Sequence, residues 1–250
     1  MTERKKGRFS TIILAAGKGT RMKSSLVKVL HPLCGRPMLT YPVAVAREVG
    51  SEVIVIVVGH QAELVKESIT DKELIFVEQR EQLGTGHAVL QARDNFLGFD
   101  GTILILCGDV PLLMSSTAGM LLDYHFSGNW AVTVLTTVLA DPFGYGRIVK
   151  GRGGDVLKIV EERDATLEEK KVREINTGIY CVESRFLFEA IADIGNKNVQ
   201  GEYYLTDIIE VARKKGYTVG SFMTNDPAEV MGINTPDDLE RASRIIEGRS

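Results

Sequence analysis

Apolar runs and amphipathic stretches alternate through the first half of the chain. Buried strands are predicted at 9–15, 53–58, 74–77 and 102–106, with helices between them at 38–49, 62–69 and 86–95. Because parallel strands need a crossover between them, this order predicts an α/β fold with a mostly parallel mixed sheet and helices on both faces. Ligands of such sheets bind where the carboxyl ends of the strands meet.

The second half is less regular, although the same two kinds of element recur. Strands are predicted at 131–139, 148–149, 156–160, 174–182 and 217–223, and helices at 184–191, 205–214 and 236–246. The glycine-rich segment 151–154 is typical of a hairpin turn. No long polar linker separates the two halves, so we predict a single domain over residues 1–250.

Composition places the chain among ordinary globular proteins. Its 250 residues suffice for one large α/β domain or two small ones, and 44% of them are hydrophobic and 25% charged. A net charge of −3 gives no general attraction for nucleic acid or anionic membranes, so we predict neither partner. The terminal basic cluster of Arg4, Lys5, Lys6 and Arg8 is interpreted as a solvated tail.

Cysteine usage and hydropathy indicate the compartment. Cys34, Cys107 and Cys181 are far apart without C-x-x-C spacing, which argues against a disulfide framework or zinc site and favours a reducing environment. No apolar run approaches the ~18–20 residues that span a bilayer, and the N-terminus has no signal-peptide core. We therefore expect a cytoplasmic protein.

The most informative segment, residues 14–22, follows the first predicted strand. Its small residues allow backbone N–H groups to approach phosphate oxygens, and Arg21 and the nearby Lys28 can neutralise a triphosphate. A Walker A loop is excluded because Gly19 stands in place of its Ser or Thr. The dinucleotide fingerprint is excluded because Met22 replaces its last Gly or Ala. The Gly-x-Gly alone is equally compatible with a structural turn.

The complete run 14–22 resembles the signature of the sugar-nucleotide pyrophosphorylases and of related cytidylyl- and molybdopterin-guanylyltransferases. Further segments resemble one branch, the uridylyltransferase domain of bacterial bifunctional N-acetylglucosamine-1-phosphate uridylyltransferases: 28–31 (KVLH), 81–88 (EQLGTGHA), 108–111 (GDVP), 144–148 (GYGRI), 176–179 (NTGI) and 201–207 (GEYYLTD). The resemblance covers residues 10–239. It implies a Rossmann-like nucleotidyltransferase fold with a nucleotide-binding half (1–112), a sugar-binding half (113–232) and a C-terminal helix (233–250).

The resemblance also implies roles for individual residues. The nucleotide would be bound by Leu14, Ala15, Gly17, Gln79, Gly84 and Thr85, with Gln79 reading the uracil edge. The sugar would be contacted by Gly146, Glu161, Asn176 and Tyr204, with Thr206 near its phosphate. Arg21 and Lys28 would bind phosphates, and Asp109 and Asn234 would hold Mg²⁺.

Physical chemistry supports the metal pair independently. Asp109 follows the predicted strand 102–106, so its carboxylate is expected at the carboxyl end of that strand. Mg²⁺ takes one or two protein oxygens and fills its other positions with water and phosphate, which suits an Asp and an Asn. Two structural alternatives remain. Asp109 could serve a turn, and the segment after Asn234 also reads as a helix start, with Thr235 as N-cap and Pro236 at N1.

Other assignments have structural alternatives as well. Glu161 lies in the charged stretch 160–164, for which a solvated face is the ordinary interpretation. Tyr204 and Thr206 open a predicted helix, where a core or capping role is a rival. The four histidines form no ligand-spaced pair, and His87 is interpreted as structural.

The chain departs from the family pattern at two positions. Val27 stands where relatives usually have Pro, which restores a backbone N–H and predicts a less rigid Lys28 loop. Cys107 replaces a residue that is often aromatic or larger, which predicts an altered pocket wall around the sugar. The sequence contains no hexapeptide repeats, so acetyl transfer is not predicted and no oligomeric state is assumed.

The resemblance implies uridylyl transfer from UTP to N-acetylglucosamine 1-phosphate, which yields UDP-N-acetylglucosamine, a cell-wall precursor, and pyrophosphate. In-line attack on the α-phosphorus needs positioning and charge neutralisation rather than a protein nucleophile. The same chemistry on another hexose 1-phosphate or nucleotide is the nearest alternative. From another class, a sugar-nucleotide sensor without turnover is the rival, and the set of Arg21, Lys28, Asp109 and Asn234 argues against it.

Overall fold

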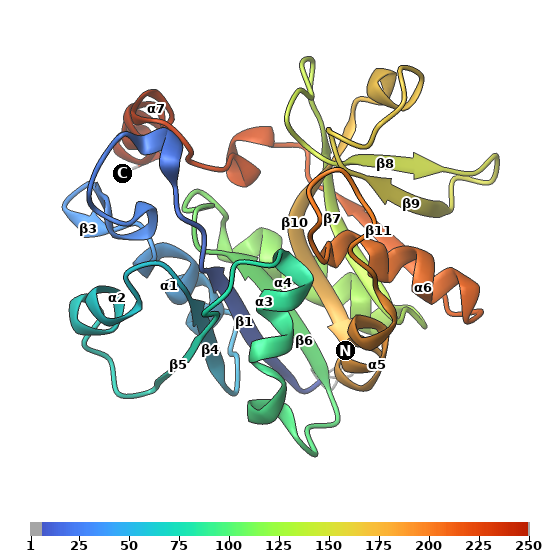
Figure 1. Ribbon diagram of the computed structural model, residues 1–250, viewed down its shortest axis with the longest axis horizontal. Helices are drawn as coiled ribbons and strands as arrows, with labels where there is room; N and C mark the ends of the chain where they lie inside the picture. Colours follow the sequence, from blue (N-terminus) through green and yellow to red (C-terminus); the bar gives the residue numbers. More distant parts are fainter. Residues whose placement is uncertain (1–6, 250) are drawn as a thin grey trace, which may run out of the picture.

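The predicted strands assemble into one mixed sheet (Figure 1), in a computed structural model that describes residues 7–249. Across its main path the strands follow the order β11-β7-β10-β6-β1-β4-β5. In chain order these are β1 (Phe9–Ala15), β4 (Ile54–Val58), β5 (Leu74–Glu78), β6 (Thr102–Cys107), β7 (Val132–Val138), β10 (Glu174–Glu183) and β11 (Val219–Met223). The mixed α/β fold expected from the alternation is therefore confirmed.

The two halves of the sheet differ in strand direction. β1 runs parallel to β4 and β6, and β4 runs parallel to β5. β10 is antiparallel to β6 and β7, and it also pairs with β8 (Arg147–Lys150), which forms an antiparallel hairpin with β9 (Val156–Val160). The turn of this hairpin is the predicted glycine segment, where Gly154 has a φ of 84°. The hairpin extends away from the main sheet on the right of Figure 1.

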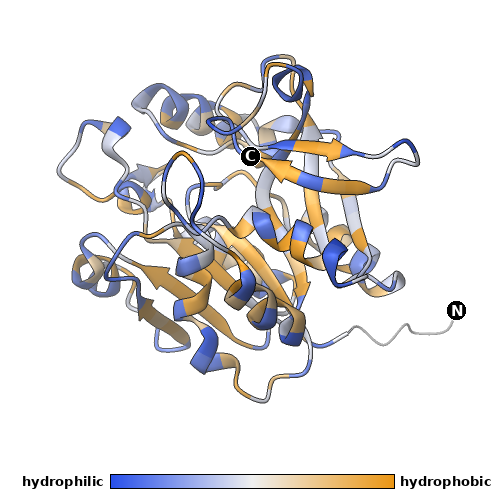
Figure 2. Cartoon of the chain, turned by 45° about the vertical axis from the view of Figure 1, so that its right-hand side comes forward, coloured by the Kyte–Doolittle hydropathy of each residue, from blue (hydrophilic) through white to orange (hydrophobic). Residues whose placement is uncertain are grey.

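Helices cover both faces of the sheet, as predicted. One apolar cluster packs α1 (Thr40–Glu48), α2 (Ala62–Ser68) and α4 (Ser115–Ser127) on one face. A second cluster packs α3 (Thr85–Gln91), α5 (Ser184–Asp193) and α6 (Ile208–Lys214) on the other. The strands between them are coloured as predominantly hydrophobic in Figure 2, because burial on both faces excludes the polar alternation of an exposed sheet.

The C-terminal helix packs against an early part of the chain. α7 (Pro236–Arg249) lies over a small hairpin of β2 (Pro32–Leu33) and β3 (Arg36–Pro37), with Leu33, Leu112 and Ala242 buried between them. Figure 1 shows this as red ribbon beside blue. The packing carries the residues just before α7 to the end of β6, where the site forms.

Some of the structure lies outside the predictions. The pattern assigns no element to α4, because its buried face includes Thr117 and His125, which conceal the helical period of its apolar positions. The β2–β3 hairpin is too short to give a pattern. Of the basic cluster, Arg4, Lys5 and Lys6 lie outside the described residues, whereas Arg8 donates two hydrogen bonds to Glu52. Across residues 7–249, no helix combines the length and apolarity needed to cross a membrane.

Candidate functional site

A cavity of about 540 Å³ lies at the carboxyl ends of β1 and β6, where the fold predicts a ligand site. All six residues predicted to bind the nucleotide line it: Leu14, Ala15, Gly17, Gln79, Gly84 and Thr85. Lys28 and Asp109 line the same cavity. The structure thus gathers residues from five separate segments of the first half around one space.

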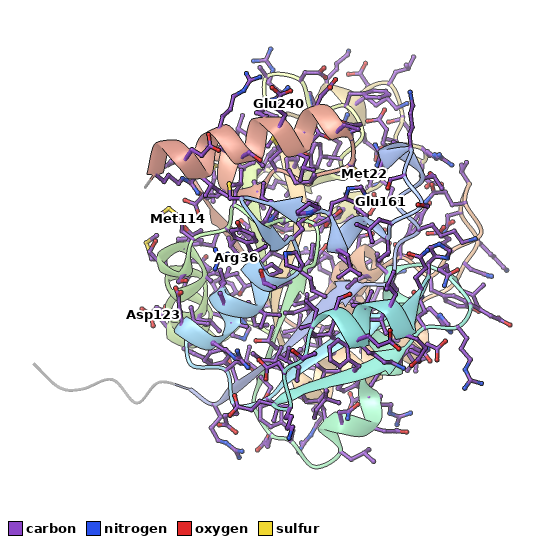
Figure 3. All side chains as sticks on the ribbon, turned by 90° about the vertical axis from the view of Figure 1, so that its left-hand side faces the viewer. Met22, Arg36, Met114, Asp123, Glu161 and Glu240 are labelled. Atoms are coloured by element: carbon purple, nitrogen blue, oxygen red, sulfur yellow. The ribbon has the colours of Figure 1, made fainter. Side chains whose placement is uncertain are left out.

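The loop after β1 is shaped by a left-handed residue and a buried anchor. Gly19 has a φ of 61° and leads into a 3₁₀ turn (Thr20–Met22) in which Met22 is buried. A Cβ on Gly19 would lie 2.5 Å from the Cβ of Lys28, so only glycine allows the loop and the Lys28 segment to approach this closely. In Figure 3, Met22 lies below the start of α7. The adjacent Arg21 donates a hydrogen bond to Asn234.

A second close approach joins the two halves of the chain. Gly84 has a φ of 107°, and a Cβ there would lie 2.6 Å from the carbonyl oxygen of Tyr203. The Tyr203 N–H donates to the Leu83 carbonyl over 2.8 Å, and the Leu205 N–H donates to Thr85 Oγ1 over 3.0 Å. This wall of the cavity is therefore fixed by contacts with residues 203–205 of the second half.

Two glutamines stand beside this wall. Gln79 is buried, and its Nε2 donates to the Gly84 carbonyl over 3.0 Å and contacts Nδ1 of His87 at 3.1 Å. Gln82 donates to the Gln79 carbonyl and also lines the cavity. Sequence reasoning missed Gln82, although it lies inside the matching segment 81–88. His87 contacts Gln91 as well as Gln79, in accord with its structural interpretation.

Two cationic side chains converge on Asp109 and Asn234 at one edge of the cavity. Lys28 Nζ lies 2.5 Å from Asp109 Oδ2 and 3.2 Å from Asn234 Oδ1. A guanidinium nitrogen of Arg21 donates to the same Asn234 oxygen over 2.9 Å. The Ile233 N–H donates to the Asp109 carbonyl over 2.8 Å, which brings the end of the chain beside β6. Four predicted residues that span more than 200 positions thus meet.

This arrangement fits a divalent cation. The oxygens of Asp109 and Asn234 both face one ammonium group, so they can also be offered to one metal ion, and a carboxylate with an amide oxygen is a donor set that Mg²⁺ accepts. The helix-start interpretation also holds, because Thr235 Oγ1 accepts from the Asp238 N–H and Asp238 accepts from the Thr235 N–H. Capping fixes the backbone at Asn234 and leaves its side-chain oxygen directed at Lys28.

The predicted sugar residues form a second group. Gly146 accepts the Asn176 N–H over 2.9 Å, and a Cβ on Gly146 would lie 3.5 Å from Glu161 Oε2. Thr206 Oγ1 donates to Glu161 Oε1 over 3.1 Å. The Tyr204 hydroxyl instead donates to Asp164 over 3.1 Å. Four of the five residues therefore cluster, while the phenol oxygen of Tyr204 is engaged elsewhere.

Carboxyl groups crowd this second group and shift one another's pKa values. Burial raises the pKa of Glu161, and the neighbouring Asp207 and Asp164 raise it further. Burial, together with Glu210, raises the pKa of Asp207 to about 6. Burial and the hydrogen bond to Asp164 raise the pKa of Tyr204 to about 12. Glu161 is therefore half-buried in an acidic environment rather than part of a solvated face.

The two residues that depart from the family pattern, Cys107 and Val27, both make hydrogen bonds in the structure. Cys107 lines the cavity and donates to the Gly178 carbonyl over 3.4 Å, and burial raises the pKa of its thiol to about 12, so it remains protonated at neutral pH. The N–H of Val27, which a proline would lack, donates to Gln61 Oε1 over 2.9 Å. The side chain of Val27 is buried.

A cavity at the carboxyl ends of parallel strands, with a small-residue loop on one side and two cations beside a carboxylate, is typical of α/β proteins that bind nucleotide phosphates. The chain belongs to the nucleotidyl transferase family, whose sequence pattern matches residues 10–244. The family expected from the sequence motifs is thereby confirmed.

Curated relatives and solved structures agree with this assignment. The chain is 53% identical over 243 residues to the "Bifunctional protein GlmU" of Geotalea daltonii, covering 97% of this chain and 53% of that protein. It is 46% identical to the protein of the same name from Clostridioides difficile, covering 96% and 52%. The chain thus spans about half the length of these relatives. A UDP-glucose pyrophosphorylase complexed with UDP-glucose superposes with a TM-score of 0.78 at 19% identity, covering 97% of this chain and 100% of that one, which shows a shared fold.

Proposed function

We propose that this chain is a uridylyltransferase that joins N-acetylglucosamine 1-phosphate to UTP and releases pyrophosphate. The observation that supports it best is the convergence of Arg21, Lys28, Asp109 and Asn234 at the edge of the cavity. A pair of cations beside a carboxylate and an amide oxygen is what charge neutralisation during phosphoryl chemistry requires. The similarity to proteins named "Bifunctional protein GlmU" supports the same proposal.

The nucleotide would lie in the 540 Å³ cavity. The backbone of Leu14, Ala15 and Gly17 would follow the phosphates and ribose, because small residues permit that approach. Gln79 would face the base with its amide oxygen, since its Nε2 donates to the Gly84 carbonyl. Thr85, at the start of α3, would complete the contacts to the ribose.

The sugar 1-phosphate would bind between the cavity and the β8–β9 hairpin. Gly146 leaves open the space beside Glu161, and Asn176 and Thr206 contribute hydrogen-bonding groups at the same place. Tyr204 would act through Asp164, since its hydroxyl is held there. The carboxylate of Glu161 would accept hydrogen bonds from sugar hydroxyls.

Catalysis in this proposal depends on positioning. Arg21 and Lys28 would hold the phosphates in line for attack on the α-phosphorus, and both would neutralise charge that develops there. Asp109 and Asn234 would hold a Mg²⁺ ion, which would supply charge neutralisation at the phosphates. Cys107 would contribute no nucleophile, because its thiol stays protonated.

A cytoplasmic location and a role in supplying a cell-wall precursor are part of the proposal. All three cysteines, Cys34, Cys107 and Cys181, are free thiols, which accords with a reducing compartment.

The test is pyrophosphate release in the presence of Mg²⁺, with each nucleoside triphosphate and a panel of hexose 1-phosphates. Release that needs UTP and N-acetylglucosamine 1-phosphate is the expected result. Release with another sugar or nucleotide would retain the reaction type and replace the substrate. No release from any pair, with UDP-sugar still bound in calorimetry, would replace the enzyme with a sensor.

A further inference from the structure

Gln61 bridges the turn after β4 to the segment that precedes Lys28. Its Oε1 accepts the Val27 N–H over 2.9 Å, and its Nε2 donates to the Ser25 carbonyl over 2.9 Å. One side-chain amide therefore pairs with a backbone donor and a backbone acceptor that lie two residues apart in the same segment. Gln61 does not line the cavity at the ends of β1 and β6.

The backbone of Gln61 is itself unusual. Its φ of 55° lies in the left-handed region, which disfavours any residue that has a Cβ. Glycine would be the relaxed choice at this position. Such outliers persist where the surrounding contacts hold them, and here those contacts are the two hydrogen bonds to Ser25 and Val27.

The other hydrogen bonds of the segment held by Gln61 are local. The Leu26 N–H donates to Ser24 Oγ, and the Leu26 carbonyl contacts His31 Nε2 at 3.2 Å. Both contacts stay within residues 24–31, whereas Gln61 joins the segment to the end of β4. Val27 adopts φ −58° and ψ 139°, and its buried side chain adds apolar packing.

The position of Lys28 is therefore fixed by contacts on two sides. On one side its Cβ abuts Gly19 of the loop after β1, with no room for another carbon. On the other side the preceding peptide is held by Gln61. Between these constraints the lysine Nζ reaches Asp109 and Asn234.

We propose that Gln61 is a positioning residue, which fixes the backbone before Lys28 so that the ammonium group lies at the phosphate site. The inference rests on the proposed function, because it concerns the placement of Lys28 for uridylyl transfer. It also explains how valine can replace the usual proline at position 27. The Val27 N–H donates a hydrogen bond to Gln61, and this contact restrains the loop.

The first variant is Gln61→Gly, which removes the amide and relaxes the left-handed backbone at the same time. The melting temperature is expected to hold or rise, while kcat falls about ten- to a hundredfold, because a misplacement of about 1 Å costs that much. A residue with only a structural role would lower the melting temperature and leave kcat unchanged. Gln61→Asn is the matched control. Asparagine keeps an amide and tolerates the left-handed region, but its side chain is one methylene too short to make the contacts with Ser25 and Val27.

The decisive partner is Val27→Pro. Proline holds φ near the −58° that Val27 already adopts and has no N–H, so it supplies rigidity without Gln61. Val27→Pro alone is expected to retain kcat within about threefold. In that background Gln61→Gly should cost less than about threefold in kcat, whereas it costs about tenfold or more with Val27 present. Equal losses in both backgrounds would overturn the proposal.

A direct readout is the exchange of the Val27 amide hydrogen with solvent, followed by NMR. The wild type should protect this hydrogen, and Gln61→Gly should accelerate its exchange at least about tenfold while β1 and β4 remain protected. If the wild type is active and Gln61→Gly changes neither the exchange rate of this hydrogen nor kcat, or leaves either one unchanged, the role of Gln61 is overturned. A wild type that transfers no uridylyl group to any sugar 1-phosphate would instead overturn the proposed function, so the two failures are distinguishable.

Discussion

The residues predicted to bind the nucleotide and those predicted to bind the sugar lie in different halves of the molecule and are held by different kinds of contact. In the first half the cavity is shaped by backbone, as where Gly84 lies against the peptide of Tyr203. In the second half the predicted sugar residues form a separate group built from side chains, with Glu161 and Thr206 hydrogen-bonded beside the acidic Asp207. In the proposed function, backbone contacts would serve groups that all nucleotides share, whereas titratable side chains would discriminate among sugars and respond to pH. The comparison predicts that mutations in the two halves fail in different ways.

The largest effect is expected at the edge of the cavity, where Lys28 contacts both Asp109 and Asn234. Asp109→Ala should reduce turnover on the order of 10²–10³-fold, because a charge-stabilising group at the phosphates is lost. Far-UV circular dichroism should stay unchanged. Asp123, an exposed carboxylate on α4 that Figure 3 labels, provides the control, and its alanine variant should retain full turnover. Undiminished pyrophosphate release by Asp109→Ala would remove this residue from the metal and phosphate site.

A backbone-built wall should not tolerate even one methyl group. Gly84→Ala forces a Cβ to within 2.6 Å of the Tyr203 carbonyl oxygen, so the free energy of unfolding should fall by about 2 kcal/mol or more and UTP binding should weaken. Denaturant titration and calorimetry measure the two effects.

Gly98 provides the matched control for that experiment. It also has a positive φ, of 77°, but an added Cβ would meet nothing within 4 Å. Gly98→Ala therefore reports the strain of a positive φ without a steric contact, and UTP affinity should stay unchanged. If the two variants lose equal stability, the contact with Tyr203 is not what demands glycine at position 84.

The same contrast explains what the sequence predicts well. Strands such as β1 and β6 are largely apolar runs, and the residues at their ends follow from that placement together with the family motifs. Helix α4 was missed because its buried face carries Thr117 and His125. The hydrogen bonds of Gln61 and the hydrogen bond from Tyr204 to Asp164 join segments that are distant in the sequence. No local sequence pattern therefore predicts them.

In the side-chain half, Glu161→Gln should raise the KM for the sugar 1-phosphate about tenfold and change the KM for UTP little, since a charged acceptor is lost. Burial raises the pKa of Glu161, so the wild-type carboxylate takes up a proton at a higher pH than an ordinary glutamate does. The wild-type KM for the sugar should therefore rise as pH falls through that pKa. Glutamine does not titrate, so the variant's profile should be flat over the same range.

The control for the sugar site is Glu168→Gln, whose side chain is 81% exposed and pairs with Lys171 on the surface. It should reproduce the wild-type profile in full. An equally steep profile in Glu161→Gln would assign the pH dependence to another group.

The smallest expected effect tests whether the charge of Asp207 lowers the stability of the second half. Folding raises the pKa of Asp207 from 3.8 to about 6, so its ionised form lowers stability above pH 6, and this cost disappears as pH falls through 6 toward 4. Asp207→Asn should therefore raise the melting temperature at pH 8 by about 1–2 °C, a small gain because the carboxyl group is partly solvated. At pH 4 the variant and the wild type should melt together. A gain of equal size at both pH values would show that shape, rather than charge, distinguishes the two side chains. The cost of Gly84→Ala should not vary over this pH range, because it comes from contact between an added methyl group and a backbone carbonyl, neither of which titrates. That difference separates the two halves by experiment.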